Sequence, residues 1–178
     1  MASGHVQDQA QQIVPTASYP QPLLLFRSEE GRSFANVSEQ AGAAFASPLV
    51  GRAVCTGDID NDGGVDAVVT NAEGQPLLLR NVAAGGGRWI SLRLLDAGSN
   101  TQAQGARIIL ETSAGKRVHD VTTSGSIFAA NDVRAHFGLG AREQVRGVTV
   151  RWPDGKTERF GPQEADRQVT LRRGAGIR

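Results

Sequence analysis

The chain has 178 residues, enough for one medium domain or two small ones, and its 39% hydrophobic content can supply a core. Nineteen basic residues nearly balance eighteen acidic ones, which argues against a general nucleic-acid binder. A single cysteine excludes an internal disulfide and a cysteine-based zinc site, and no run of 18 apolar residues is present to form a membrane-spanning helix.

The formal charge of +1 conceals an asymmetry between the two halves of the chain. Residues 1–87 carry four arginines and nine acidic residues, a net charge of −5, whereas residues 88–178 carry fifteen basic and nine acidic residues, a net charge of +6. The small-residue run at 83–87 is suited to a flexible hinge. No signal peptide is visible. We predict three segments: an extended lead-in rich in glutamine and proline at 1–20, a repeat-like region at 21–84 and a β domain at 88–175.

The first half predicts short strands. A hairpin is expected over residues 23–37, and a helical turn follows that begins at Ser38 and stops at Gly42. Residues 21–27 and 75–81 are similar at an offset of 54 residues, which is in the range of repeat architectures. Three further strands are expected at 52–56, 65–70 and 76–80.

The most informative stretch is Asp58-Ile59-Asp60-Asn61-Asp62-Gly63-Gly64-Val65-Asp66, called the acidic loop below. Carboxylates stand at its positions 1, 3, 5 and 9, a glycine at position 6 permits a sharp turn, and position 7 offers a carbonyl. Calcium takes six to eight oxygen ligands, and four carboxylates this close would repel one another without a cation. The pattern favours calcium over magnesium. An ordinary acidic turn is the alternative, and an EF-hand is disfavoured because strands flank the loop.

Residues 56–71, which contain the acidic loop, resemble an FG-GAP or VCBS repeat, the calcium-loop blade of integrin-type β-propellers. A closed propeller needs four to eight blades and only about one and a half fit here, so a partial propeller is expected. The resemblance implies a ligand set of four side chains and one main-chain carbonyl: Asp58, Asp60, Asp62, Asp66 and Gly64.

The second half shows short alternating segments typical of an antiparallel β-sandwich or small barrel. In the first of them, residues 88–95, we assign Ile90, Leu92 and Leu94 to the core face. Pro153-Asp154-Gly155 predicts a hairpin turn. The other strands are expected at 106–112, 116–123, 135–140, 145–152, 156–160 and 167–172.

A second resemblance covers about residues 88–173. It is carried by the stretches 105–107, 124–126, 131–132, 134–140 and 150–155. They are similar to the ASPIC/UnbV domain, found in the cartilage acidic protein-like family and in many bacterial secreted proteins. With the preceding repeat, the chain is similar to the C-terminal part of an FG-GAP/VCBS-repeat protein with an ASPIC/UnbV domain. The resemblance implies calcium-stabilised extracellular binding or matrix roles.

Some residues allow other hypotheses. Ser124, Asp132 and His136 invite a hydrolase interpretation, but no G-x-S-x-G elbow is present. We expect Ser124 and Asp132 to lie in turns, and His136 to lie in a strand and to bond to a loop. Trp89 and Trp152 could form an aromatic platform for a sugar or peptide, although such indoles more often pack inside a protein.

Three features receive structural interpretations. Cys55 is expected to be a small buried hydrophobe, and Asn36-Val37-Ser38 is a glycosylation sequon. A group of arginines is expected on a solvated sheet face, or against an acidic partner. They are Arg142, Arg146, Arg151, Arg159, Arg167, Arg172 and Arg173.

The sequence as a whole predicts an all-β protein, with partial β-propeller blades and a calcium loop followed by an antiparallel β-sandwich. We expect a calcium-binding structural or interaction module, secreted or periplasmic by the resemblance, with a protein or glycan partner. One alternative is a subunit that assembles into an oligomer or filament through exposed strand edges. Another is an enzyme or biosynthetic accessory protein, although no catalytic residue is predicted.

Overall fold

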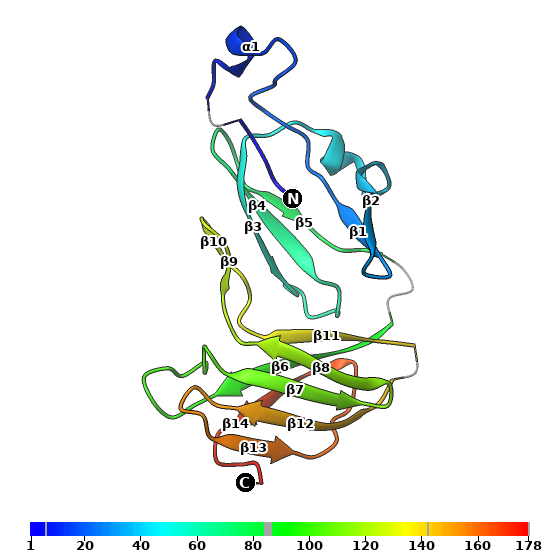
Figure 1. The fold of residues 1–178 in the computed structure, drawn as a ribbon, viewed down its shortest axis with the longest axis vertical. Helices are drawn as coiled ribbons and strands as arrows, with labels where there is room; N and C mark the ends of the chain where they lie inside the picture. The colour runs from blue at the N-terminus through cyan, green and yellow to red at the C-terminus, as the bar shows by residue number, and fades with distance from the viewer. Residues whose placement is uncertain (6, 84–86, 142, 178) are drawn as a thin grey trace. The chain divides into compact units, whose positions relative to one another are not determined.

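Strands dominate the computed structural model, which describes residues 1–5, 7–83, 87–141 and 143–177 (Figure 1). The all-β class is therefore confirmed. The centre of the predicted hinge, 84–86, and Arg142 lie outside the described residues. Contacts divide the chain into two compact units, and neither is one continuous stretch. The first unit comprises Met1–Thr56, Asp66–Arg80 and Ser124–Ala130, and the second comprises Gly57–Val65, Asn81–Thr123 and Asn131–Arg178.

Two sheets build most of the second unit. In the first sheet, β6 (Arg88–Leu95) lies between β11 (Ala135–Gly140) and β14 (Arg167–Arg172). Every strand of the two sheets overlaps the segment predicted for it. The second sheet has the order β13-β12-β7-β8, with bounds Thr157–Phe160, Val145–Arg151, Arg107–Thr112 and Gly115–Asp120.

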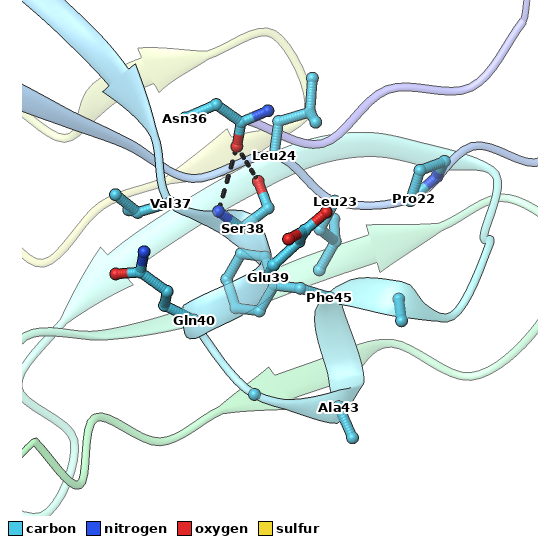
Figure 2. Close-up of a pocket in the computed structure, with 12 residues that line it drawn as sticks. Pro22, Leu23, Leu24, Asn36, Val37, Ser38, Glu39, Gln40, Ala43 and Phe45 are labelled. Atoms are coloured by element: carbon cyan, nitrogen blue, oxygen red, sulfur yellow. Dashed lines mark hydrogen bonds between the residues drawn. The ribbon is translucent and has the colours of Figure 1, made fainter.

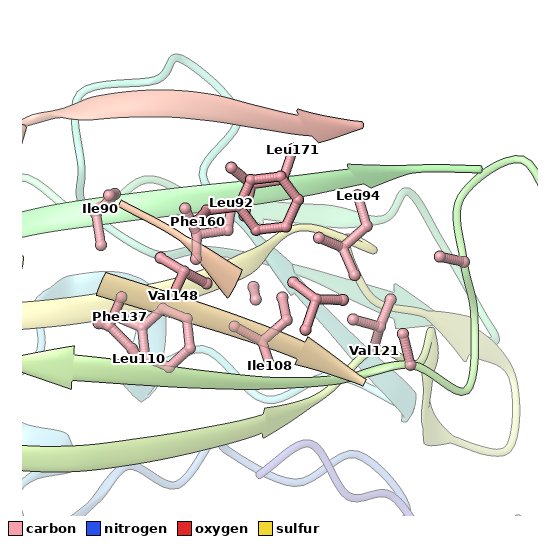
Figure 3. Close-up of a cluster of buried hydrophobic side chains, with 14 of the residues drawn as sticks. Ile90, Leu92, Leu94, Ile108, Leu110, Val121, Phe137, Val148, Phe160 and Leu171 are labelled. Atoms are coloured by element: carbon pink, nitrogen blue, oxygen red, sulfur yellow. The ribbon is translucent and has the colours of Figure 1, made fainter. Parts of the chain in front are cut away.

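One apolar core joins the two sheets into a sandwich (Figure 3). Ile90, Leu92 and Leu94 of β6 are buried in it as predicted, because successive side chains of a strand point to opposite faces. Leu110 of β7 and Val148 of β12 enter the same core from the other sheet. The predicted turn is also present, since the Gly155 N–H donates to the Trp152 carbonyl at 2.9 Å and Gly155 has a φ of +86°.

One pairing departs from the predicted antiparallel arrangement. β14 runs parallel to β6, with Arg167 opposite Ile90 and Arg172 opposite Leu95. The pairs β11–β6, β12–β7, β12–β13 and β7–β8 are antiparallel. β14 follows a strand of the other sheet, so no hairpin turn sets its direction, and local turn signals could not reveal it.

The first unit contains smaller elements. β1 (Phe26–Glu29) and β2 (Ser33–Asn36) form an antiparallel hairpin, and β3 (Gly51–Gly57), β4 (Asp66–Asn71) and β5 (Leu77–Leu79) form a sheet in that order. Two 3-10 turns, η1 (Ser38–Gln40) and η2 (Ala43–Ala46), follow the hairpin. The apolar cluster of this unit is small and centres on Leu23, Leu49 and Val69.

Three local features differ from the predictions for these segments. The lead-in contains a one-turn helix, α1 (Ala10–Ile13), in which the Val14 N–H donates to the Ala10 carbonyl, and Pro15 follows where the helix ends. β1 begins later than predicted. Residues 124–130 form a hairpin of β9 (Ser124–Ser126) and β10 (Ala129–Ala130) instead of a simple turn. No helix in the described ranges has the length and apolarity to cross a membrane.

The partial propeller stays a prediction. The described strands of the repeat-like region form a three-stranded sheet and a separate hairpin, not one four-stranded sheet. The acidic loop lies where the sequence placed it, between the end of β3 and the start of β4.

Candidate metal loop

The backbone of the acidic loop turns sharply at two residues with positive φ. Asn61 has φ +60° and Gly63 has φ +91°, conformations that asparagine tolerates and glycine favours. At Gly63 a second constraint applies, because a Cβ there would lie 2.0 Å from Nε1 of Trp89. Position 63 therefore requires glycine for both its φ and its packing.

Asp58 organises the loop from its first position. Its side chain is buried, Oδ1 accepts the Asp62 N–H at 3.1 Å, and Oδ2 accepts the Gly63 N–H at 3.0 Å. Each carboxylate oxygen accepts more than one hydrogen bond or ligand, so Asp58 can hold the turn and still face a cation. Asp62 turns toward Gly64, whose N–H donates to Asp62 Oδ1 at 2.8 Å.

Three of the four predicted side-chain ligands come together. Asp58, Asp60 and Asp66 each offer a carboxylate oxygen, and these oxygens lie within 4.8 Å of one another. Asp58 and Asp66 are buried and Asp60 is exposed. Hard carboxylate oxygens at this spacing fit calcium. Asp62 is not among the three that converge, and its ligand role stays a prediction, as does that of the Gly64 carbonyl.

Arg134, just before β11, contacts the acidic loop within the second unit. Its Nη1 donates to Asn61 Oδ1 at 2.6 Å and its Nη2 donates to the Asp58 carbonyl at 2.6 Å. The same guanidinium binds Asp132 Oδ2 through Nε at 2.6 Å and Gln168 Oε1 through Nη1 at 2.8 Å. One side chain thus links the loop to two other segments of the sandwich.

His136 makes a second link to the loop. Its Nε2 lies 3.0 Å from the Gly63 carbonyl oxygen, and it donates there in the Nε2–H tautomer. The Trp89 ring stacks on the imidazole, with centroids 5.8 Å apart and planes inclined by 11°. The prediction of a strand histidine bonded to a loop is confirmed. Sequence reasoning included Arg134 only as part of the matching stretch 134–140 and gave it no role.

The Asp132 carboxylate is held as an anion beside Arg134. Burial acts to raise its pKa, but hydrogen bonds from the Arg134 side chain and main-chain N–H outweigh burial, helped by the charges of Arg134 and Arg93. The net result is a pKa below the ordinary value for aspartate. Asp132 and His136, two members of the hypothetical catalytic triad, thus have structural partners.

Both tryptophans pack against other residues of the second unit, but only Trp152 is fully buried. Trp152 is 1% exposed, and Arg173 lies over its ring, 5.6 Å from the centroid. Trp89 is half-buried between His136 and the glycine turn at residue 63. Neither forms an open aromatic platform.

Other singled-out residues have local partners. Cys55 is half-buried, with Sγ 3.6 Å from the Val68 carbonyl oxygen. In the sequon, Asn36 Oδ1 accepts hydrogen bonds from the main-chain N–H and the hydroxyl of Ser38. Three of the arginines expected on a solvated face form ion pairs with acidic residues of the same unit: Arg159 with Glu111, Arg167 with Glu164, and Arg173 with Asp96 and Asp154.

An open cavity of about 790 Å³ lies in the first unit, away in sequence from the acidic loop (Figure 2). Leu23 and Phe45 line it together with Ser38, which bonds to Asn36 at its edge. Glu39 and Gln40 are polar groups in the lining. No pattern in the sequence predicts this cavity, because its lining comes from several loops and turns.

The C-terminal part of the chain is similar to known proteins. Residues 96–178 match the family model described as ASPIC and UnbV. Cartilage acidic protein 1 of Mus musculus is 30% identical over 103 residues, which are 56% of this chain and 16% of the mouse protein. The chain therefore spans less than a fifth of the length of that relative.

Proposed function

Since the chain contains an ASPIC/UnbV domain, we propose that it is a structural or interaction module of extracellular type whose acidic loop binds calcium. The family match and the weak similarity to cartilage acidic protein 1 support the first part of the proposal. The similarity to cartilage acidic protein 1 also supports secretion, and a periplasmic location is the alternative within this proposal. The partner would be a protein or a glycan.

The calcium part depends on one observation, the convergence of Asp58, Asp60 and Asp66 with two of the three carboxylates buried. Burial of a carboxylate is costly unless the charge is balanced, and like charges at this spacing repel. A calcium ion would balance them. It would also tie the end of β3 to the start of β4, because the first and last of these residues flank the loop.

A thermal melt with calcium or with chelator tests the calcium site. A bound ion stabilises the folded state by RT ln(1 + [Ca]/Kd), about 2.7 kcal/mol at a hundredfold excess over Kd. We expect a Tm rise of several degrees with calcium and a smaller rise with magnesium. Asp60→Asn should reduce the rise, because it removes a negative charge although its amide oxygen can still bind calcium. Asp8→Asn, at an exposed acid outside the loop, should keep the rise. A wild-type Tm that is the same in millimolar calcium and in chelator would refute the site.

Asp62→Asn in the same experiment decides whether the fourth carboxylate is a ligand. If Asp62 binds the ion, this variant should weaken the calcium response as Asp60→Asn does. If Asp62 only accepts the Gly64 N–H, its amide oxygen can still do so, and the calcium response should be retained.

Self-assembly is a second candidate, favoured by the β1–β2 hairpin. In the described ranges this hairpin pairs with no further strand, and Phe26 and Phe34 are 44% and 71% exposed. Exposed strand edges with apolar side chains are sites of strand addition. Light scattering over a concentration series should show a mass that rises with concentration. Phe34→Lys should abolish that rise, and Ile13→Lys, on α1, should not. A constant monomer mass excludes this candidate.

Several contacts favour a non-catalytic module over an enzyme. Asp120 is bound bidentately by Arg107 at 2.6 and 2.8 Å, Asp132 is bound by Arg134, and His136 bonds to a main-chain carbonyl. Asp132 and His136 are the acid and the base that the hydrolase hypothesis would need beside Ser124, and Asp120 is a further acidic candidate for an enzyme pocket. Each of these side chains is bound to a neighbouring group of the fold, which favours a structural role. We therefore assign no reaction to the chain.

A further inference from the structure

We propose that Arg134 of the ASPIC/UnbV domain is a positioning residue for the acidic loop and thereby sets its affinity for calcium. The inference rests on the proposed function for the calcium affinity itself, but the positioning can be measured without any ion. It would make calcium binding and the stability of the sandwich mutually dependent, because coupling between two processes is reciprocal.

The contacts of Arg134 are suited to fixing a loop. Its side chain is only 18% exposed, and a planar guanidinium offers five N–H donors in a rigid fork. Two of its contacts fall on the loop, at the Asp58 carbonyl and the Asn61 side chain, and the others fall on Asp132 and Gln168 of the sandwich. Arg134 thereby holds Asp58, the first predicted ligand, by its main-chain carbonyl and not by its carboxylate.

The points of attachment lie beside the cation-facing groups, not on them. Arg134 bonds to the main chain of Asp58 and leaves the Asp58 carboxylate to the Asp62 and Gly63 N–H groups. It also holds Asn61, which has a positive φ. Because Asn61 and the Asp58 carbonyl are fixed before an ion arrives, less conformational entropy is lost on binding.

His136 and Trp89 hold the far side of the same turn. His136 Nε2 contacts the carbonyl of Gly63, directly before the predicted carbonyl ligand Gly64. The Trp89 ring fills the space where a Cβ of residue 63 would lie. The loop is therefore fixed at residues 58, 61 and 63 by groups of the second unit, to which residues 57–65 themselves belong.

Electrostatics alone would give Arg134 the opposite role. A positive charge near a cation site weakens cation binding, so its removal would tighten binding if charge dominated. The Asp132 carboxylate, directly paired with the guanidinium, offsets that charge. Positioning predicts that loss of Arg134 weakens calcium binding, and the sign of the change separates the two effects.

The experiment measures calcium Kd by titration calorimetry for wild type, Arg134→Gln and Arg134→Lys. Partners one shell outside a metal site commonly change affinity by 10- to 100-fold when removed. We expect Kd to rise about tenfold or more in both variants, since lysine keeps the charge but loses the fork. An unchanged or lower Kd in Arg134→Gln would overturn the proposal.

Arg173→Gln is the matched control. Arg173 is 24% exposed, pairs with Asp96 and Asp154, and lies over Trp152, so its loss should destabilise the sandwich to a similar degree. Its ion pairs involve no residue of the acidic loop. We expect calcium Kd to stay within twofold of wild type. Far-ultraviolet circular dichroism, which follows the strands and not the Trp152 ring beneath Arg173, checks that each variant folds.

Amide hydrogen exchange in chelator separates this inference from the proposed function. The Asp62 and Gly63 N–H groups donate to Asp58, so their exchange reports the loop without an ion. Arg134→Gln should speed their exchange about tenfold relative to wild type, with Arg173→Gln unchanged. If wild type binds no calcium, the proposed function fails while this exchange still decides the positioning role. Unchanged exchange of both amides in Arg134→Gln would overturn it.

Discussion

The two units differ in how much apolar core each contains. In the described residues, one cluster of seventeen buried side chains lies inside the sandwich, whereas the cluster of the first unit centres on three. The sandwich core includes Trp152 and Phe137, and its two sheets share it. Because burial of apolar area is the main stabilising contribution to folding, the sandwich can account for its own stability from its side chains.

The first unit must rely on other contributions. Its hairpin β1–β2 exposes Phe26 and Phe34, and its cluster borders the open cavity at Leu23 and Phe45. A small apolar cluster is a marginal source of stability. We therefore expect the sandwich to be the more stable of the two units, although both are built from strands.

The largest expected effect is loss of a core leucine in the sandwich. Leu110→Ala removes a fully buried side chain, and such changes cost about 2–5 kcal/mol. Leu23→Ala should cost less, about 2 kcal/mol or below, because its neighbours already border open space at the cavity. Urea unfolding, monitored by proteolysis within each region, measures the loss of unfolding free energy in both variants. Equal losses for the two variants would show that the small cluster is as tightly packed as the large one.

A smaller but more local effect is expected at Gly63. Gly63→Ala places a Cβ at φ +91° and against the Trp89 ring, and the positive φ alone costs about 1–2 kcal/mol. Gly98→Ala is the control, because nothing lies within 4 Å of its Cβ position and its φ is not positive. Chemical denaturation should show a loss of at least about 2 kcal/mol for Gly63→Ala, because displacement of the Trp89 ring adds to the cost of the positive φ, and almost none for the control. Equal stabilities would mean that the turn at residue 63 adapts to a side chain.

The sequence was sufficient where a pattern is local. Alternation placed Ile90, Leu92 and Leu94 in the core because one face of that strand is buried, and a one-residue shift would expose all three. Pro153 and Gly155 predicted their turn from local preferences, since proline favours the second position of a turn and glycine adopts the positive φ found at residue 155. Spacing predicted that the carboxylates at loop positions 1, 3 and 5 converge, and those of Asp58 and Asp60 do, but the third that joins them is Asp66, which only the family resemblance implied as a ligand.

The rest depends on contacts between residues far apart in the chain. Arg134 reaches Asn61 and Asp58 across 73 and 76 residues, and no local pattern marks such a pairing. The parallel direction of β14 is likewise set by the arrangement of two sheets. Asp62 fits the ligand spacing but bonds to the Gly64 N–H, a competition between backbone and ion that residue types alone do not resolve.

The smallest expected effect tests how far the sandwich core extends toward its edge strand. His119 lies on β8, opposite Ile108, and its ring makes an edge contact with Phe137 at 5.9 Å. Burial lowers the pKa of His119 below its usual 6.5, although the charge of Asp120 partly opposes this. Above about pH 6.5 the imidazole is neutral in both the folded and the unfolded chain, so its contribution to stability is complete.

As the pH falls through that value, the unfolded chain binds the proton first, and stability declines until the folded pKa is passed. His119→Gln cannot titrate, so its stability relative to wild type should rise between pH 7 and pH 5. Urea midpoints at four pH values measure this change. Parallel profiles for the two proteins would mean that the imidazole is solvated, and that the core ends at β7 instead of reaching the edge of the sheet.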